Sequence, residues 1–260
     1  MKIAIVNQKG GVGKTTTAIN LATALAATGL NVLLIDIDAQ GNASTGLGID
    51  RRSRRCSIYE VLIGTATLSE ATVKTSIPGL SIIPSTSALA GAEIDLVGLD
   101  RRMQRLAESL ADNAVYDYVL IDCPPSLGLL TLNALTAADS VLVPLQCEFF
   151  ALEGLSQLLS TIERVRNGPN RRLTLLGIVL TMIDRRNRLS DQVATDVRAV
   201  MGAKVFATAI PRNVRLSEAP SHGLPALIYD VKCLGSTAYL ALAREVIERT
   251  NDTVLEVVHG

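Results

Sequence analysis

Short apolar runs that end in polar or acidic residues recur along the chain, and longer segments with helical spacing lie between them. The apolar runs predict buried strands at residues 2–7, 31–36, 80–84, 116–122, 140–144, 173–181 and 205–210. The clearest helical segments are 15–28, 152–166 and 236–249. This alternation predicts an α/β fold with a mostly parallel, twisted sheet and helices on both faces. Residues 58–114 carry short helix-like pieces around one strand and give no detailed prediction.

The composition is that of an ordinary globular protein. The chain has 260 residues, 48% of them hydrophobic, and its 25 basic and 25 acidic side chains give a net charge of zero. A chain of this length can bury a large core as one α/β unit, and no Pro-rich or Gly/Ser-rich linker divides it. We therefore expect a single domain over residues 1–260. A neutral protein has no overall attraction to nucleic acid, so binding of that kind requires a local patch.

The cysteines and the apolar runs indicate a cytoplasmic location. Cys56, Cys123, Cys147 and Cys233 lie far apart and form no C-x-x-C pair, which argues against a zinc ribbon or a disulfide framework. Their use as small core residues is typical of a reducing compartment. No run reaches the roughly 18 uncharged apolar residues of a membrane span.

The segment after the first predicted strand has the features of a phosphate-binding loop. It reads Gln8-Lys9-Gly10-Gly11-Val12-Gly13-Lys14-Thr15-Thr16, and a helical pattern follows at once. The glycines allow backbone N–H groups to turn toward phosphate oxygens, and the helix N-terminus adds a partial positive charge. In such a loop Lys14 neutralises the β and γ phosphates, and the Thr15 hydroxyl ligates Mg²⁺.

Acidic residues close two of the predicted strands. Asp36 and Asp38 stand two positions apart, so the period-2 alternation of a strand puts both on one side, where both can face the loop. Asp122 ends the run 118–122, and a hydrophobic strand that ends in aspartate is the Walker B pattern. The aspartate of this pattern holds Mg²⁺ directly or through water. An aspartate that only begins a loop or caps a helix gives the same local pattern.

The loop departs from the common pattern G-x-x-x-x-G-K-[ST], because Gln8 stands at the first glycine. The string K-G-G-x-G-K-T-T, opened by Lys9, resembles the deviant Walker A motif of the ParA/MinD family of P-loop ATPases. Further blocks, at 38–48, 148–154 and 210–223, resemble the chromosomal ParA/Soj branch of that family. The resemblance covers residues 2 to about 232 and implies a P-loop NTPase fold of the deviant Walker A type.

The resemblance also implies cofactors and residue roles. It implies ATP and Mg²⁺, with Lys9 reaching the phosphates of a nucleotide in the partner subunit. Asp38 orients the attacking water, Asp36 supports the Mg²⁺ shell, and Asp122 belongs to the metal shell together with Thr15. Adenine contacts are expected after the last predicted strand, with Asn213 as a contact and Pro211 in packing, although Pro211-Arg212-Asn213 is also an ordinary turn sequence.

The function implied by the resemblance is DNA segregation. In this family ATP binding closes a sandwich homodimer, the dimer binds double-stranded DNA without sequence preference, and a ParB-like centromere-binding partner stimulates the hydrolysis that releases it. Such a protein is cytoplasmic and associated with the nucleoid. Residues 182–215 carry seven basic and three acidic side chains, a local charge of +4. Arg186 and Arg215 are the expected DNA contacts by position, although an ordinary solvated face also carries such charges.

Other functions remain open from the sequence. A MinD-like membrane switch needs a basic amphipathic C-terminal helix, whereas residues 243–260 carry more acidic than basic side chains, so we expect no membrane partner. An iron-sulfur ATP-driven reductase needs two suitable cysteines in each subunit, and Cys123 with Cys147 is the only pair near the predicted switch segments. A positioning ATPase for plasmids or protein clusters shares every motif. The basic run 51–55 is either another contact or a solvated loop, and we favour the loop.

Overall fold

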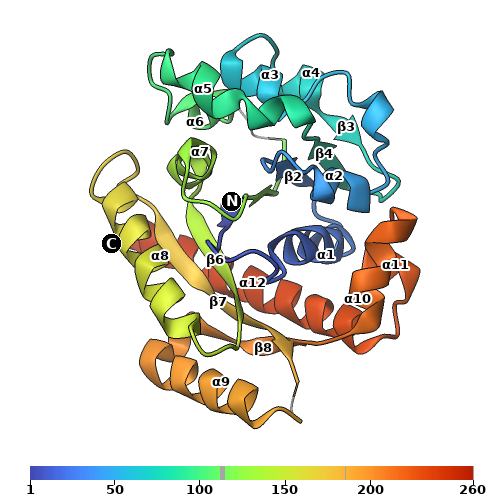
Figure 1. Ribbon diagram of the computed structural model, residues 1–260, viewed down its shortest axis with the longest axis vertical. Coiled ribbons are helices and arrows are strands. Elements are labelled where there is room, and N and C mark those ends of the chain that lie inside the picture. Colours follow the sequence, from blue (N-terminus) through green and yellow to red (C-terminus); the bar gives the residue numbers. More distant parts are fainter. Residues whose placement is uncertain (112–114, 185, 260) are drawn as a thin grey trace.

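A sheet of eight strands forms the centre of the computed structural model, which describes residues 1–111, 115–184 and 186–259 (Figure 1). The strands are β1 (Lys2–Ile5), β2 (Val32–Asp36), β3 (Val73–Lys74), β4 (Leu80–Ile83), β5 (Tyr118–Asp122), β6 (Ser140–Gln146), β7 (Thr174–Ile183) and β8 (Val205–Pro211). Their order is β3-β4-β2-β5-β1-β6-β7-β8. Every pairing is parallel except that of β3 with β4 at the edge.

Helices cover both faces of this sheet, as Figure 1 shows. They are α1 (Lys14–Ala26), α2 (Asn42–Gly46), α3 (Ile58–Ile63), α4 (Leu68–Ala71), α5 (Ala92–Val97), α6 (Arg105–Ser109), α7 (Leu129–Ala137), α8 (Ala151–Arg166), α9 (Arg188–Met201), α10 (Val214–Glu218), α11 (Ala226–Tyr229) and α12 (Leu234–His259). Among the described residues, no helix has the length and apolar content that crossing a membrane requires.

The core is divided into two layers by the sheet. Ile3 and Ile5 pack with apolar residues of α1, α10, α11 and α12, whereas Ala4 and Val6 pack with those of α3 and α5 to α9. Successive side chains of a strand point to opposite faces, so a buried parallel strand must be apolar at every position. This is why the strands read as continuous apolar runs in the sequence.

The predicted fold class is confirmed, and each of the seven predicted strands is present with small changes at its ends. The sequence missed β3, a two-residue strand that is too short to give a pattern. The helix predicted at 236–249 is longer at both ends and spans Leu234–His259. The parallel strands direct their carboxyl ends to one edge of the sheet, which is where an open α/β fold places its ligands.

Candidate nucleotide-binding site

A cavity of about 320 Å³ lies at this edge of the sheet, around the start of α1. It is lined by Gly10, Gly11, Gly13, Lys14, Thr15, Thr16, Asp38, Gln40, Asn42, Pro125 and Met182. The glycine-rich loop and Asp38 thus surround one space, although Asp38 follows the loop by more than twenty positions in the sequence. We refer to it as the phosphate cavity.

The loop adopts a backbone that favours glycine. Gly11 and Gly13 have φ angles of 77° and 90°, in the left-handed region that residues with a Cβ rarely occupy. Gly13 is also the N-cap of α1 and provides no capping side chain, so the first N–H groups of the helix are available to an anion. The Thr181 hydroxyl donates to the Val12 carbonyl at 2.8 Å and ties the loop to β7.

Lys14 lies inside the loop that it belongs to. Its side chain is buried, and its Nζ donates to the Lys9 carbonyl at 2.9 Å. Burial lowers the pKa of Lys14, while the carboxylate of Asp122 acts in the opposite direction. An ammonium held in a poorly solvated loop has a strong electrostatic interaction with phosphate oxygens.

Lys9 lies on the surface, at the start of the same loop. Its side chain is 52% exposed and forms an ion pair with Glu148, which follows β6. Lys9 is not among the residues that line the phosphate cavity of its own chain. In this structure the Lys9 side chain therefore binds Glu148 at the surface rather than facing the phosphate cavity of its own chain.

Asp122, the last residue of β5, is a fully buried carboxylate. The register of β2 with β5 puts it directly beside Asp36, and both side chains have no exposed surface. Neither oxygen of Asp122 has a hydrogen-bond partner among the described residues. Burial, and next the charge of Asp36, raise the pKa of Asp122 well above its ordinary value, whereas Thr15 and Lys14 oppose the shift.

These groups fit a magnesium ion. Mg²⁺ takes hard oxygen ligands and is usually held by one or two carboxylates together with phosphates and waters. The Thr15 hydroxyl lies on the cavity wall, whereas Asp122 is fully buried and does not line the cavity. Asp122 is close enough to Thr15 for that residue to lower its pKa, so its oxygens would support an ion at Thr15 from behind the wall, directly or through a water. No cluster of three or more His, Cys, Asp or Glu side chains that suits a metal occurs in the described parts of the chain, so an all-protein cage is not formed there.

Asp36 has a different environment from the one its spacing suggested. Its Oδ2 accepts hydrogen bonds from the Ser44 backbone N–H at 2.8 Å and from the Ser44 hydroxyl at 2.6 Å. Because Ser44 lies in the first turn of α2, the carboxylate acts as a remote cap for a helix whose own N-cap is Gly41. Burial raises the pKa of Asp36 to about 6.

The expectation that both aspartates face the loop is therefore correct for Asp38 only. Asp38 lines the phosphate cavity, whereas Asp36 does not. The alternation rule failed because β2 ends at Asp36, and the backbone beyond a strand end no longer follows period 2. Asp36 can support a metal shell only indirectly, through α2 and its neighbour Asp122.

A second cavity, of about 370 Å³, adjoins the first. It is lined by Gly13, Thr16, Thr181, Met182, Ile210, Pro211, Arg212, Asn213, Val214, Leu216, Ser217 and Tyr239. Three of these, Gly13, Thr16 and Met182, also line the phosphate cavity. We call it the base cavity, because Pro211 and Asn213 both lie on its wall.

Sequence reasoning missed Met182, which lies between the two cavities. Its φ of 53° is in the left-handed region, which is uncommon for a residue with a side chain and is typical of functional sites. No sequence signal marks this residue, because its place depends on how β7 passes beside Gly13. Gln40 and Asn42 were also missed as site residues, although both lie inside the 38–48 block.

Arg186 lies in the loop after β7, and Arg215 lies in α10, which follows β8 at the same edge. β7 and β8 pair at Ile183 and Pro211, so the segments that follow these strands begin side by side. The Arg186 side chain is 90% exposed and binds Asp184 through Nε and Nη2, at 3.0 and 3.1 Å. Arg185, another member of the predicted basic patch, lies outside the described residues.

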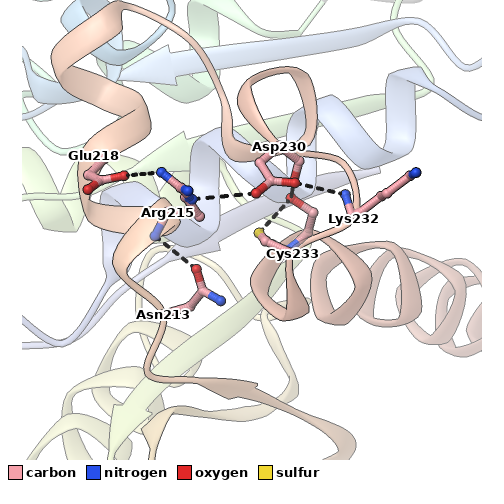
Figure 2. Close-up of polar contacts among 7 residues, drawn as sticks. Asn213, Arg215, Glu218, Asp230, Lys232 and Cys233 are labelled. Atoms are coloured by element: carbon pink, nitrogen blue, oxygen red, sulfur yellow. Dashed lines mark hydrogen bonds and ion pairs between the residues drawn. The ribbon is translucent and has the colours of Figure 1, made fainter.

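Arg215 is held by two carboxylates. Figure 2 shows it between Glu218, 2.9 Å from Nη1, and Asp230, 3.5 Å from Nε. The Asn213 side chain accepts a hydrogen bond from the Arg215 backbone N–H at 2.9 Å and so caps α10. The predicted base contact and the predicted DNA contact are therefore joined directly.

The cysteine pair that suggested a metal cluster is buried. Cys123 and Cys147 lie in the same apolar core layer. Burial raises the pKa of Cys147 to about 11 and that of Cys123 well above its ordinary value. Because the thiolate is the metal ligand, these environments are unfavourable for an iron-sulfur cluster.

Comparisons with known proteins agree with this site. A family model described as an AAA domain matches residues 1–175. The chromosome partitioning protein ParA of Caulobacter vibrioides (strain NA1000 / CB15N) is 64% identical over 253 residues, which are 96% of this chain and 95% of that protein. The sporulation initiation inhibitor protein Soj of Bacillus subtilis (strain 168) is 52% identical over 247 residues, 94% and 97% of the two chains.

Solved structures show the same architecture with nucleotides bound. Cobyrinic acid a,c-diamide synthase from Mycobacterium smegmatis, with an ATP analogue and magnesium, has a TM-score of 0.85 and 39% identity over 96% of this chain and 95% of its own. MinD from Pyrococcus horikoshii, with Mg-ADP, has a TM-score of 0.79 and 28% identity, over 94% and 95% of the two chains.

The parallel sheet, the glycine-rich loop at the start of α1 and the aspartate that ends β5 define a P-loop ATPase. The matches cover nearly the whole chain rather than the loop alone. The chain belongs to the ParA/Soj family of chromosome-partitioning ATPases.

Proposed function

We propose that this protein is a DNA-partitioning ATPase in which ATP binding and hydrolysis control dimerisation and DNA binding. The observation that carries the proposal is the pair of adjoining cavities, which share Gly13, Thr16 and Met182. One cavity is lined by the glycine-rich loop with Lys14, which suits phosphates, and the other has a mostly apolar wall, which suits a base. Each has a volume typical of a small-molecule site. Residues 1–260 act as a single ATPase domain in this proposal.

ATP and Mg²⁺ are the cofactors. Backbone N–H groups of residues 9–16 and the Lys14 ammonium bind the phosphates, while Thr15 and Asp122 hold the ion, which neutralises developing phosphate charge when bound. Asp38 orients the attacking water from the cavity wall. Its Oδ1 accepts a hydrogen bond from the Gln40 backbone N–H at 3.0 Å, which restricts its orientation. Pro211 and Asn213 contact the adenine.

The dimer is the ATP-bound state, and Lys9 is its contact with the partner's nucleotide. The half-exposed position of Lys9 beside Glu148 supports this role, because a surface ion pair is weak and is readily exchanged for phosphate. DNA is bound without sequence preference through Arg186, Arg215 and their copies in the second subunit, since non-specific affinity comes from phosphate binding. A ParB-like partner stimulates hydrolysis and releases the complex from the nucleoid.

The test is DNA binding with ATP, with ADP and without nucleotide, at two salt concentrations. We expect binding with ATP only, weaker binding at higher salt, and persistence in Asp38→Ala, which blocks hydrolysis. Lys14→Ala abolishes binding. Arg215→Glu weakens it and reduces the steepness of the salt dependence by about one unit for each DNA phosphate that the variant no longer binds. ATP hydrolysis without DNA binding in any nucleotide state would contradict the proposal.

Arg171→Glu is the matched control for Arg215→Glu. Arg171 is exposed and precedes β7, so it lies at the opposite edge of the sheet from the cavities. The same reversal of charge at this position leaves DNA binding nearly unchanged. An equal decrease in both variants would show that net charge, rather than the proposed contact, controls the affinity.

A further inference from the structure

The basic run 51–55 contains one arginine that differs from its neighbours. Arg51, Arg52 and Arg55 are exposed, as expected of a solvated loop, but Arg54 is only 8% exposed. The preference for a solvated loop is therefore wrong for this position. Burying a guanidinium has a high desolvation cost unless its N–H groups are hydrogen-bonded.

Those hydrogen bonds go to the segment that follows Asp38 and to Ser85. Nη2 of Arg54 donates to the Ile49 carbonyl at 2.8 Å and to the Thr45 hydroxyl at 2.9 Å. Nη1 donates to the Ser85 carbonyl at 2.9 Å. The guanidinium thus joins the end of α2 to the loop after β4.

Gly41 shows how closely the guanidinium packs against the start of α2. Its φ is 63°, and a Cβ at this position would lie 2.5 Å from Nη1 of Arg54 and 3.3 Å from the Ser85 carbonyl oxygen. Arg54 therefore contacts α2 at both ends. A helix of five residues has little stability of its own, so such contacts determine where it lies.

A chain of buried hydrogen bonds continues from Ser85 to the strand ends. The Ser85 backbone N–H donates to the Ser44 hydroxyl oxygen at 3.0 Å. Ser44 in turn donates through its backbone N–H and its hydroxyl to the Asp36 carboxylate, which lies beside Asp122. The same helix and its preceding loop supply Gln40 and Asn42 to the phosphate cavity, next to Asp38.

We infer that Arg54 is a positioning residue for hydrolysis, which fixes α2 and so holds Asp38 and its neighbours at the phosphate cavity. The inference rests on the proposed ATPase function. Arg54 does not line the phosphate cavity, so it acts through the residues that it holds. Its removal leaves the loop of residues 9–16 intact. Nucleotide binding therefore remains, and the rate of the chemical step falls.

The experiment compares Arg54→Met, which keeps the length of the side chain, with Arg52→Met, a matched change at an exposed position in the same run. Hydrogen exchange of residues 38–49 is measured first, without nucleotide. We expect exchange in Arg54→Met to be at least about 10-fold faster, because the segment opens locally. Arg52→Met exchanges like the wild-type protein. Equal exchange in all three proteins would overturn the inference.

Steady-state ATP hydrolysis is measured on the same proteins. We expect kcat of Arg54→Met to fall about 10- to 100-fold, as for a misplaced catalytic group, while KM for ATP changes by less than about threefold. Faster exchange with an unchanged kcat would overturn the positioning role. Absence of hydrolysis in the wild-type protein would instead contradict the proposed function. The two failures are distinguishable, because the first is seen only in the variant and the second already in the wild-type protein.

Chemical rescue distinguishes a positioning role from general damage. A cavity of about 270 Å³ lined by Ala39, Gln40, Arg51, Arg54, Thr86 and Ser87 gives access to the guanidinium position. Millimolar guanidinium is expected to restore part of kcat in Arg54→Ala, whereas equal sodium chloride does not. Failure of guanidinium to restore any activity in a folded Arg54→Ala protein would count against the inference.

If the apolar variants do not fold, Arg54→Lys provides the test. Lysine keeps the positive charge, but its single nitrogen cannot replace the two guanidinium nitrogens that donate to the Ile49 and Ser85 carbonyls at the same time. We therefore expect a folded protein with a lowered kcat and faster exchange at 38–49. Wild-type kcat and exchange in Arg54→Lys would show that charge alone is sufficient, and the inference would be wrong.

Discussion

Replacing Asp122 by asparagine tests the chemistry of the buried aspartate pair. Asp122 is fully buried, its oxygens have no hydrogen-bond partner among the described residues, and Asp36 lies beside it in the strand register. In the absence of a metal ion, this arrangement opposes folding. We therefore expect Asp122→Asn to make the protein more stable without nucleotide, although the same change removes a ligand of the proposed magnesium site.

The magnitude follows from the missing partners. A buried polar group without a hydrogen bond costs about 1–3 kcal/mol, and a charged one costs more. Asp122→Asn removes the cost of burying a charge, but the new asparagine amide is itself a buried polar group without partners. We therefore expect a net gain of about 2 kcal/mol in the free energy of unfolding. For a chain of this size the gain corresponds to a rise in Tm of about 4–8 °C.

The assay is thermal unfolding at pH 8 with EDTA, repeated with Mg-ATP. A ligand present at 100 times its Kd stabilises the native state by about 2.7 kcal/mol. The wild-type protein gains this increment, whereas Asp122→Asn gains much less because its metal site is impaired. Asp100→Asn, at an exposed position, controls for the removal of one charge. Lower stability of Asp122→Asn in EDTA would refute the reasoning, since it would mean that the carboxylate has stabilising partners.

Three further predictions follow from the same contacts. Burial raises the pKa of Asp36 to about 6, so the folded state binds this proton more tightly than the unfolded state does. The free energy of unfolding of the nucleotide-free protein therefore increases as the pH falls from 8 to 5. Denaturant titrations should show this dependence in the wild-type protein and a flatter one in Asp36→Asn. Gly41→Ala places a Cβ against Arg54 at a left-handed φ, and it lowers the free energy of unfolding by about 1–3 kcal/mol in urea. Iodoacetamide leaves Cys123 and Cys147 unmodified in the native protein, whereas the two half-buried cysteines react, as mass spectrometry will show.

Much of the fold was predictable because buried parallel strands are apolar at every position. The run 118–122 reads as a strand in isolation, and it is one in the structure. The phosphate loop was predictable for another reason, since its residues are contiguous and its backbone geometry depends on glycine. Lys14 and Thr15 needed no tertiary information to be placed at the start of a helix.

The remaining features depend on contacts between distant parts of the chain. Arg54 reads as a member of a charged loop until Ser85, which is 31 positions away, accepts its hydrogen bond. Asp36 reads as a ligand until Ser44 is seen to bind its carboxylate. The position of Met182 is set by the passage of β7 beside the loop, which no local pattern reports. In each case one long-range contact changes the role of the residue.

The charge distribution explains why the proposed DNA binding needs a second subunit. The chain is neutral, and each proposed contact is already opposed by carboxylates, Arg186 by Asp184 and Arg215 by Glu218 and Asp230. Such exposed pairs contribute little to stability, so phosphates can replace the carboxylates at small cost. Two arginines nevertheless release few counterions, and the affinity of one chain is low. In the proposed dimer, both pairs of arginines would contact one duplex. Because the exponent of the salt dependence grows with each phosphate bound, a nucleotide that controls assembly would then also control DNA binding.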